Sequence, residues 1–135
     1  MTKKDYLKYG KRVAIIGASN NRNSVSNKAI RAFLDESFDV YPINPKETKI
    51  EGRVVYRDVS QIEDGVDIAS IYISPEKQDK KLANSLRKAK TKLVIFNPGT
   101  ENPKLEKQLI QYGLEVKKEC SIVGLGRHPD EFHFE

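Results

Sequence analysis

The sequence predicts an α/β fold with one doubly wound, mostly parallel sheet of five strands and helices on both of its faces. Short β-branched apolar runs alternate with segments of helical periodicity along the whole chain, as in right-handed crossovers onto a single sheet. The 135 residues suit one domain, which at that size buries about two-thirds of its unfolded surface. Turns after the expected strands are rich in Gly, Asn, Ser and Pro, whereas the opposite turns carry ordinary charged residues. These features predict a Rossmann-like single domain whose ligand side is the carboxyl end of the sheet.

The five expected strands are short, apolar and rich in β-branched residues, as buried parallel strands are. They cover residues 13–16, 38–43, 68–73, 93–96 and 114–116. The segment 46–64 has no clear periodicity except for a short extended piece at 54–56. We expect it to be irregular.

Each of the three expected helices has a start signal. Asn23, Ser24 or Ser26 can cap the first helix. Ser74-Pro75 and Asn102-Pro103 each combine a capping residue with a proline suited to the first helical position. We therefore expect the second helix to begin directly after Ser74.

The two ends of the chain are polar and flank the domain. Residues 1–11 form a polar leader, residues 12–124 the domain, and residues 125–135 a polar tail that we expect to fray. Four tail residues have metal-ligating side chains, but no expected helix or hairpin fixes their spacing, so we predict no metal site; they are His128, Asp130, Glu131 and His133.

Composition narrows the class of protein. No apolar run reaches the length of about 18 residues that a membrane span needs, and the N-terminus lacks the apolar stretch of a signal peptide. A single cysteine, Cys120, cannot form an internal disulfide, which favours the cytoplasm. The net charge is +5, but most lysines stand beside acids. Nucleic acid is therefore an unfavoured partner.

The loop from Gly17 to Ser24 joins the first expected strand to the first helix and is the main candidate site. A glycine there lets the backbone approach a ligand, and the helix N-terminus offers N–H groups and a positive dipole end to an anion. Serine hydroxyls and the guanidinium of Arg22 add phosphate donors. The candidate contacts in this loop are Gly17, Ala18, Ser19, Asn20, Arg22 and Ser24.

The second expected strand argues against a NAD site. The dinucleotide pattern G-x-G-x-x-G retains only Gly17, because Ser19 and Arg22 stand at the other two positions. NAD sites also place an acid near the end of the second strand, whereas this chain has Lys46 there. A lysine suits a ligand with a phosphate on its ribose, as in NADP and coenzyme A.

The sequence resembles the stand-alone CoA-binding-domain proteins, which are similar to the N-terminal domain of the succinyl-CoA synthetase α subunit. The resemblance spans about residues 12–124 and rests on a series of stretches in family order. They are VAIIGASNNRNSVSNKAIRAFL, VYPINPKETKIEGRVVY, VDIASIYISPE, LVIFNPGTENPKLEKQLIQYGLEV and the closing Glu119-Cys120.

The resemblance implies roles for residues at four strand ends. The loop that starts at Gly17 would line the diphosphate of coenzyme A. Asn44, Pro45 and Lys46 would meet the adenosine and its 3′-phosphate. Ile73, Ser74 and Pro75 would border the adenine or ribose. Asn97, Pro98 and Gly99 would meet the pantetheine arm.

The sequence favours a binding module over an enzyme, since it holds no recognisable Ser-His-Asp set or paired carboxylates. A sensor, carrier or regulatory protein for coenzyme A or an acyl-CoA is our first expectation. The alternatives are an NADP-dependent or acyl-CoA enzyme completed by a partner chain, and an interaction module, with a homodimer or a partner protein. Cys120 is either a packed residue without chemistry or a thiol that exchanges with the bound coenzyme.

Overall fold

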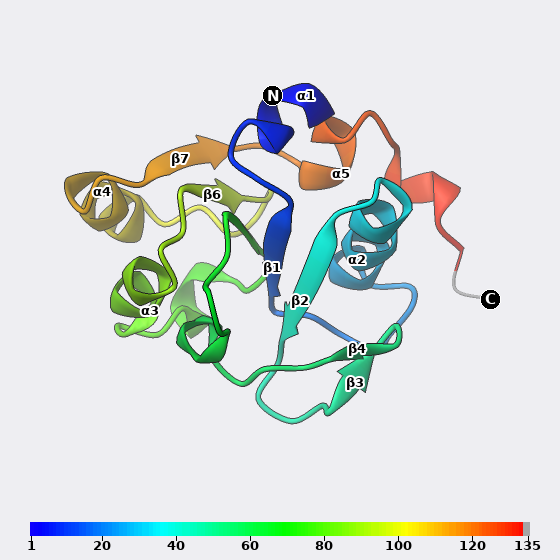
Figure 1. Ribbon diagram of the computed structural model, residues 1–135, viewed down its shortest axis with the longest axis horizontal. Coiled ribbons are helices and arrows are strands. Elements are labelled where there is room, and N and C mark those ends of the chain that lie inside the picture. Colours follow the sequence, from blue (N-terminus) through cyan, green and yellow to red (C-terminus); the bar gives the residue numbers. More distant parts are fainter. Residues whose placement is uncertain (134–135) are drawn as a thin grey trace.

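The computed structural model describes residues 1–133 and shows one parallel five-stranded sheet (Figure 1). The strand order is β2–β1–β5–β6–β7, with every neighbouring pair parallel. The predicted α/β Rossmann-like fold is confirmed. The strands are β1 (Arg12–Ile16), β2 (Asp39–Ile43), β5 (Ile68–Ile71), β6 (Leu93–Phe96) and β7 (Glu115–Lys118).

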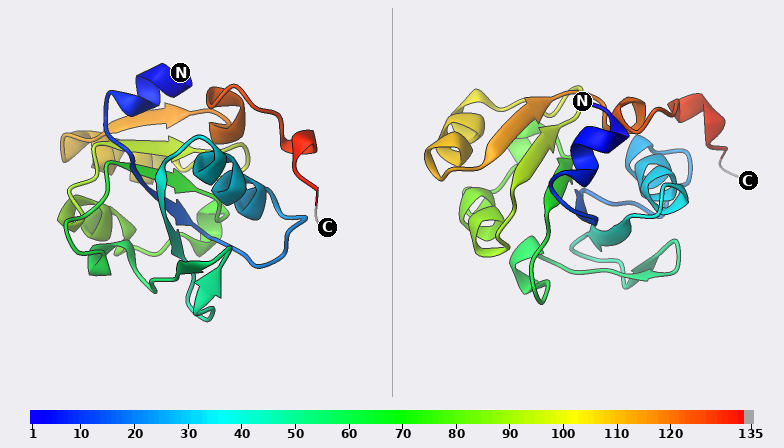
Figure 2. Two further views of the ribbon diagram at one scale, coloured as in Figure 1. Left: turned by 45° about the vertical axis from the view of Figure 1, so that its right-hand side comes forward. Right: turned by 45° about the horizontal axis from the view of Figure 1, so that its top comes forward.

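Helices cover both faces of the sheet, so two apolar clusters form the core (Figure 2). One cluster lies under α1 (Lys3–Leu7), α2 (Val25–Asp35) and α5 (Ser121–Gly124). The other lies under α3 (Leu82–Lys88) and α4 (Pro103–Gln111). The interior strand β1 explains this arrangement. Its residues 13–16 are all buried and alternate between the two clusters, as successive side chains of a strand do.

The segment between β2 and β5 has more regular structure than the sequence predicts. A short antiparallel pair, β3 (Lys49–Ile50) and β4 (Arg53–Val54), is followed by a 3₁₀ turn at Val59–Gln61. Ile43 of β2 pairs in parallel with Tyr56. The segment therefore extends the β2 side of the sheet.

Several predicted boundaries differ from the structure. β1 begins one residue earlier than expected, β2 begins at Asp39 instead of residue 38, and β5 ends at Ile71 instead of residue 73. Ser74-Pro75 opens a 3₁₀ turn at Pro75–Lys77, and the Ser74 side chain makes no capping bond, so α3 begins only at Leu82. The last strand covers residues 115–118 instead of 114–116. The expected helix start fails because a proline at the first position suits a 3₁₀ turn as well as an α-helix.

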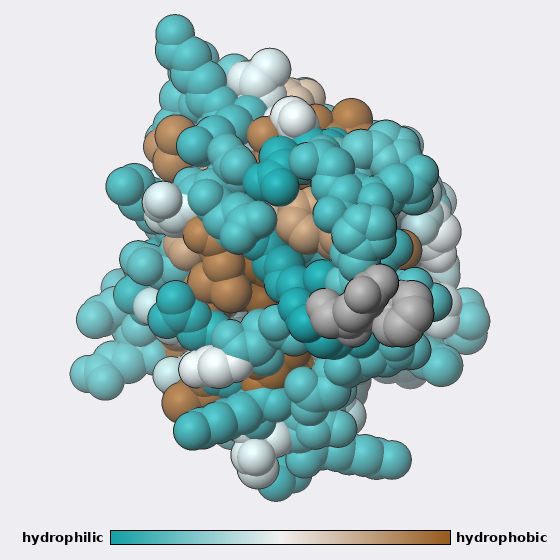
Figure 3. Space-filling view, turned by 90° about the vertical axis from the view of Figure 1, so that its right-hand side faces the viewer, coloured by the Kyte–Doolittle hydropathy of each residue, from teal (hydrophilic) through white to brown (hydrophobic). Residues whose placement is uncertain are grey.

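The tail does not fray through Phe132, contrary to our expectation. Phe132 is buried against α2, and Arg31 donates to the carbonyl of His133. Arg127 pairs with Glu36 at 2.9 Å. One aromatic side chain therefore fixes a segment whose composition is otherwise polar. On the face that carries α2 and the tail, hydrophilic side chains surround separate hydrophobic areas (Figure 3).

The leader also folds onto the domain. Tyr6 of α1 is fully buried and donates to Glu119 Oε2 at 2.6 Å. Among residues 1–133, we find no helix with the length and apolar character that crossing a membrane requires.

Candidate functional site

A cavity of about 440 Å³ opens at the carboxyl ends of β1, β2 and β5. This is the point where the chain crosses from one face of the sheet to the other, and ligands of open α/β sheets bind at such switch points. Of the sequence-predicted residues, the cavity brings together Gly17, Pro45 and Ile73. The complete lining is Ile16, Gly17, Ile43, Pro45, Arg57, Asp58, Val59, Ile73, Lys77, Asp79, Lys81 and Leu82.

The floor and the rim of this cavity differ in chemistry. Strand ends and the starts of the two flanking helical segments supply an apolar floor that includes Ile43, Val59 and Ile73. Three cations and two acids make the rim: Arg57, Lys77, Lys81, Asp58 and Asp79. An apolar floor with a few polar groups is typical of small-molecule sites. The excess of cations favours an anionic ligand.

Gly17 lets the backbone pass close to the wall of the cavity. Its φ is +91°, which side chains rarely adopt, and an added Cβ would lie 2.7 Å from Ile73 Cγ2. It would also lie 3.1 Å from the carbonyl carbon of Tyr72. Glycine is therefore required both by conformation and by space.

The first part of the loop is held by β2. The N–H groups of Gly17 and Ala18 both donate to the carbonyl of Ile43, and Asn44 Nδ2 donates to the carbonyl of Ala18 at 2.8 Å. These two N–H groups are occupied, and Asn44 is a scaffold of the loop. A ligand phosphate would therefore have to use donors further along the chain.

The second part of the loop is held by side chains of its own and by the β3–β4 segment. Ser19 Oγ accepts from the N–H of Asn21. Asn20 donates to Glu47 at 2.7 Å, and Arg22 Nε lies 3.3 Å from Glu51. The sequence predicts these polar groups as ligand contacts, and the structure shows that each already has a partner within the protein.

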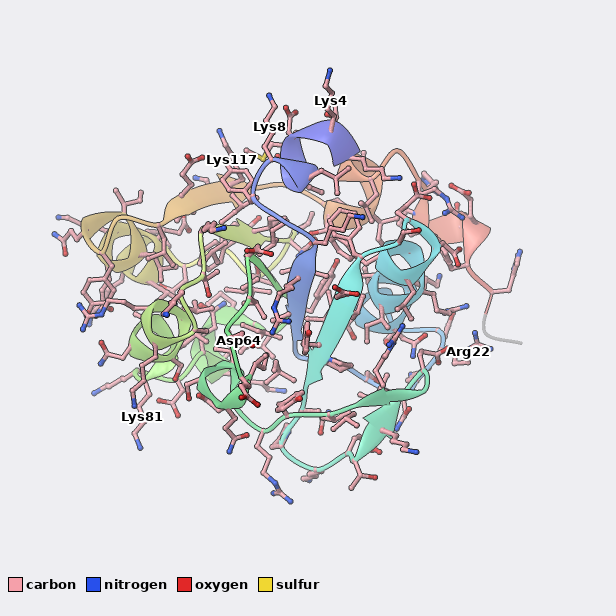
Figure 4. The ribbon with its side chains drawn as sticks, in the orientation of Figure 1. Lys4, Lys8, Arg22, Asp64, Lys81 and Lys117 are labelled. Atoms are coloured by element: carbon pink, nitrogen blue, oxygen red, sulfur yellow. The ribbon has the colours of Figure 1, made fainter. Side chains whose placement is uncertain are left out.

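The N-terminus of α2 supplies donors. Ser24 caps the helix by accepting from the N–H of Asn27. Within residues 1–133, the N–H groups of Val25 and Ser26, at the first two helical positions, donate to no protein acceptor. Free N–H groups and the positive end of the helix dipole favour an anion at this end of α2. Figure 4 shows Arg22 on the α2 side of the molecule and Lys81 on the α3 side.

Some of the predicted residues after β2 and β5 line the cavity, and others lie outside it. Pro45 and Ile73 line it, whereas Lys46 is exposed and does not. The N–H of Lys46 donates to Asn44 Oδ1 at 2.7 Å, which makes a tight turn. Ser74 and Pro75, which begin the 3₁₀ turn, are half-buried beside Ile73 and do not line the cavity either.

Asn97 belongs to a buried polar network behind the strand ends. Its Nδ2 donates to Ser70 Oγ at 2.8 Å and to the carbonyl of Ile71, and its Oδ1 accepts from the N–H of Ser121. The hydroxyls of Ser70 and Ser121 lie 2.7 Å apart. All polar atoms of this side chain are therefore used internally. The following Pro98 and Gly99 are exposed.

Cys120 lies apart from the cavity, at the start of α5, and is half-buried against the α2-side core. The hydroxyls of two tyrosines, Tyr6 and Tyr72, are buried in this region. Burial raises the pKa of Tyr72 well above its usual range. Burial and the hydrogen bond to Glu119 do the same for the pKa of Tyr6. Both hydroxyls thus stay protonated at neutral pH.

Sequence reasoning missed the three rim cations Arg57, Lys77 and Lys81. The signal for Arg57 is the run Asp58-Val-Ser-Gln61, which forms a capping box at the 3₁₀ turn and fixes the preceding residue. The two lysines were missed because the sequence pattern predicts residues 77–81 on a helix. In the part of the chain that the structure describes, no three His, Cys, Asp or Glu side chains are grouped as metal ligands.

Comparison with known proteins gives a family for the chain. Residues 11–126 match the family model described as a CoA binding domain. The ADP-forming acetate–CoA ligase of Methanocaldococcus jannaschii is 35% identical over 94 residues, which are 70% of this chain and 13% of the ligase. The ADP-forming acetate–CoA ligase I of Archaeoglobus fulgidus is 32% identical over 119 residues, 82% of this chain and 17% of the ligase. The chain thus spans only a small part of these relatives.

A solved structure covers most of both chains. The crystal structure of an uncharacterized protein superposes with a TM-score of 0.79 at 32% identity, covering 86% of this chain and 94% of that one. A crystal structure of another protein therefore has the same fold over most of its length.

Proposed function

We propose that this chain, which belongs to the family of CoA binding domains, binds coenzyme A or an acyl-CoA at the carboxyl end of β1, β2 and β5. One observation carries the proposal. A cavity with an apolar floor and a cationic rim opens beside Gly17, where the backbone leaves no room for a side chain. Such a cavity suits a flat heterocycle joined to phosphates.

The parts of the ligand can be assigned to parts of the site. The adenosine is proposed to fill the cavity between Pro45 and Ile73. The diphosphate is proposed to lie over Gly17 and to receive hydrogen bonds from the N-terminus of α2. The pantetheine arm is proposed to cross the exposed Pro98 and Gly99 toward Cys120.

The other predicted contacts have a supporting role in this proposal. Ala18, Ser19, Asn20 and Asn44 hold the loop in place through hydrogen bonds within the protein. Asn97 holds the strand ends in the same way. They would act on affinity by fixing the shape of the site.

The binding experiment is a calorimetric titration with coenzyme A, NADP and NAD. Coenzyme A should bind with the highest affinity, and NAD should bind most weakly. Ligand released from the purified protein by heat and identified by mass gives an independent answer. No heat with coenzyme A, together with tighter binding of NADP, would contradict the proposal.

We propose a carrier, sensor or regulatory role in the cytoplasm in preference to catalysis by this chain alone. The alternative is a component of a larger enzyme completed by a partner chain. The length of the ligase relatives favours that alternative, because each has several times the length of the matched part. Incubation of the purified chain with acetate, ATP and coenzyme A tests for catalysis by the chain alone. Formation of acetyl-CoA would show that the chain is a catalyst by itself.

A further inference from the structure

We propose that Arg57, and not Lys46, recognises the ribose 3′-phosphate of bound coenzyme A. This inference rests on the proposed function and names the residue that gives it specificity. Sequence position favours Lys46, because it stands three residues after the end of β2. The structure instead places Lys46 outside the cavity and Arg57 in its wall.

Backbone pairing carries Arg57 to the end of β2. The N–H of Tyr56 donates to the carbonyl of Pro42, and the N–H of Asn44 donates to the carbonyl of Tyr56, each at 3.0 Å. Ile43 and Tyr56 form a parallel bridge. Residue 57 therefore lies just beyond the carboxyl end of β2. In doubly wound nucleotide-binding folds this is where the ribose of the ligand is bound.

Three contacts orient the guanidinium and its backbone. Arg57 Nη1 donates to the carbonyl of Pro45 at 3.0 Å. The N–H groups of Arg57 and Asp58 both donate to Gln61 Oε1, at 3.1 and 3.2 Å. Gln61 of the following 3₁₀ turn is thus hydrogen-bonded to the backbone of Arg57. A guanidinium held in this way loses less conformational entropy when it binds phosphate.

The same guanidinium keeps donors for a ligand. Among residues 1–133, Arg57 Nε and Nη2 donate to no protein acceptor, and Arg57 is in no ion pair. Among the described residues, the neighbouring Asp58 forms no ion pair with Arg57, and its Oδ2 accepts from the N–H of Ser60 at 3.0 Å. Two nitrogens of a planar fork match two oxygens of a phosphate. Lys77 and Lys81 on the cavity rim add positive charge.

Lys46 has none of these features. It is exposed, and its backbone is part of the turn made by Asn44 Oδ1. Within the described residues, its ammonium group has no hydrogen bond or ion pair that would fix it near the cavity. A lysine on a flexible stem adds only a screened surface charge. It therefore serves as the matched control.

The test compares coenzyme A with dephospho-coenzyme A by calorimetry at constant ionic strength. The wild-type chain should prefer coenzyme A by about 10- to 100-fold, as expected for hydrogen bonds to a charged group. R57Q should lose most of that preference, while its affinity for dephospho-coenzyme A stays within about threefold of wild type. K46Q should keep the preference. R57K should recover only part of it, because it keeps the charge and loses the planar fork.

The outcomes separate this inference from the proposed function. If the wild-type chain binds neither ligand, the proposed function fails. If coenzyme A binds and R57Q keeps the full preference, or K46Q loses it, the assignment to Arg57 is wrong and the proposed function stands. Circular dichroism of each variant checks that the fold is kept, and a folded R57K that matches wild type in preference would also contradict the assignment.

Discussion

The two halves of the carboxyl end of the sheet differ in what their polar groups do. Beyond β1, β2 and β5 there is a cavity with rim cations, and the N–H groups of Val25 and Ser26 lack protein acceptors in the described chain. Beyond β6 and β7, Asn97 is only 2% exposed, and both polar atoms of its side chain make hydrogen bonds within the protein. We call these the open half and the closed half.

This difference shows that polar groups near the strand ends have two distinct uses. In the open half, within the described residues, the N–H groups of Val25 and Ser26 donate to no protein acceptor and are left for a ligand, although Asn44 bonds within the protein. In the closed half, the Asn97 side chain satisfies buried backbone groups. The sequence patterns of the two are alike, because both place Asn, Pro and Gly after a strand. Substitutions should therefore affect binding in one half and stability in the other.

Asn97→Ala should have the largest effect, on stability. The carbonyl of Ile71 and the N–H of Ser121 would each lose a buried partner. At about 1–3 kcal/mol for each unsatisfied group, the free energy of unfolding should fall by roughly 2–6 kcal/mol. Chemical denaturation measures this change.

Asn102→Ala is the matched control for that change. Asn102 caps α4 by accepting from the N–H of Leu105, so its loss should cost only about 1 kcal/mol. Equal losses from the two substitutions would mean that the closed half is not held by the Asn97 network.

Gly17→Val should abolish binding of coenzyme A and leave a cooperative, destabilised fold. The new side chain combines a positive φ with close contacts to Ile73 and Tyr72. Gly113→Val is the control, because Gly113 has φ +88° and no atom of residues 1–133 lies within 4 Å of an added Cβ. The control should show the backbone strain, about 1–3 kcal/mol, without the loss of binding. A Gly17→Val protein that binds normally would place the ligand elsewhere.

Tyr6→Phe, a change beside the closed half, should alter how the free energy of unfolding depends on pH in the alkaline range. Burial and the bond to Glu119 raise the pKa of Tyr6 in the folded chain. Its contribution is therefore present below the unfolded pKa of about 10 and is lost as the pH rises above it. Near neutral pH the variant should be less stable by about 1.5–3 kcal/mol, the value of a hydrogen bond to a charged group.

The difference between wild type and Tyr6→Phe should narrow above pH 10, because the phenol of Tyr6 then ionises in the unfolded wild-type chain and stays protonated in the folded one. Urea denaturation at several pH values follows this change. A constant difference between pH 8 and pH 11 would show that Tyr6 does not titrate with unfolding.

Cys120 gives the smallest expected effect. If the pantetheine arm reaches the end of β7, the Cys120 thiolate should attack coenzyme A disulfide, leaving one coenzyme A on the protein and releasing the other as a thiol. Intact mass should show one adduct, which reductant removes and Cys120→Ser lacks. Glutathione disulfide should react more slowly, since it has no nucleotide end to hold it at the site. Equal rates for the two disulfides would mean that the arm of the ligand ends before Cys120.

Much of the fold and part of the site could be predicted from sequence. The strands follow from β-branched runs, and Gly17, Pro45 and Ile73 follow from their places after strands. Arg57 was not predicted, because only the pairing of Tyr56 with β2 brings it to the cavity. Pairing between residues distant in sequence leaves no local pattern.

The same limit applies to the closed half. The bond from Ser121 to Asn97 joins residues 24 positions apart, and Ser70 and Ser121 are 51 positions apart. Asn97 alone therefore looks like a ligand residue. The buried Phe132 in a polar tail is a further case, since its partner is α2 near the start of the chain.

Amide chemical-shift mapping during a titration with coenzyme A tests the distinction between the two halves most directly. We predict the largest changes at Gly17, Arg57 and Ile73 and at the first residues of α2. The change at the buried Asn97 should be small. A second cavity lies between the 3₁₀ turn at Pro75–Lys77 and α4, and its lining residues include Gln78, Asn102 and Lys104. Changes centred on that cavity, with Gly17 unaffected, would contradict the assignment of the open half as the binding site.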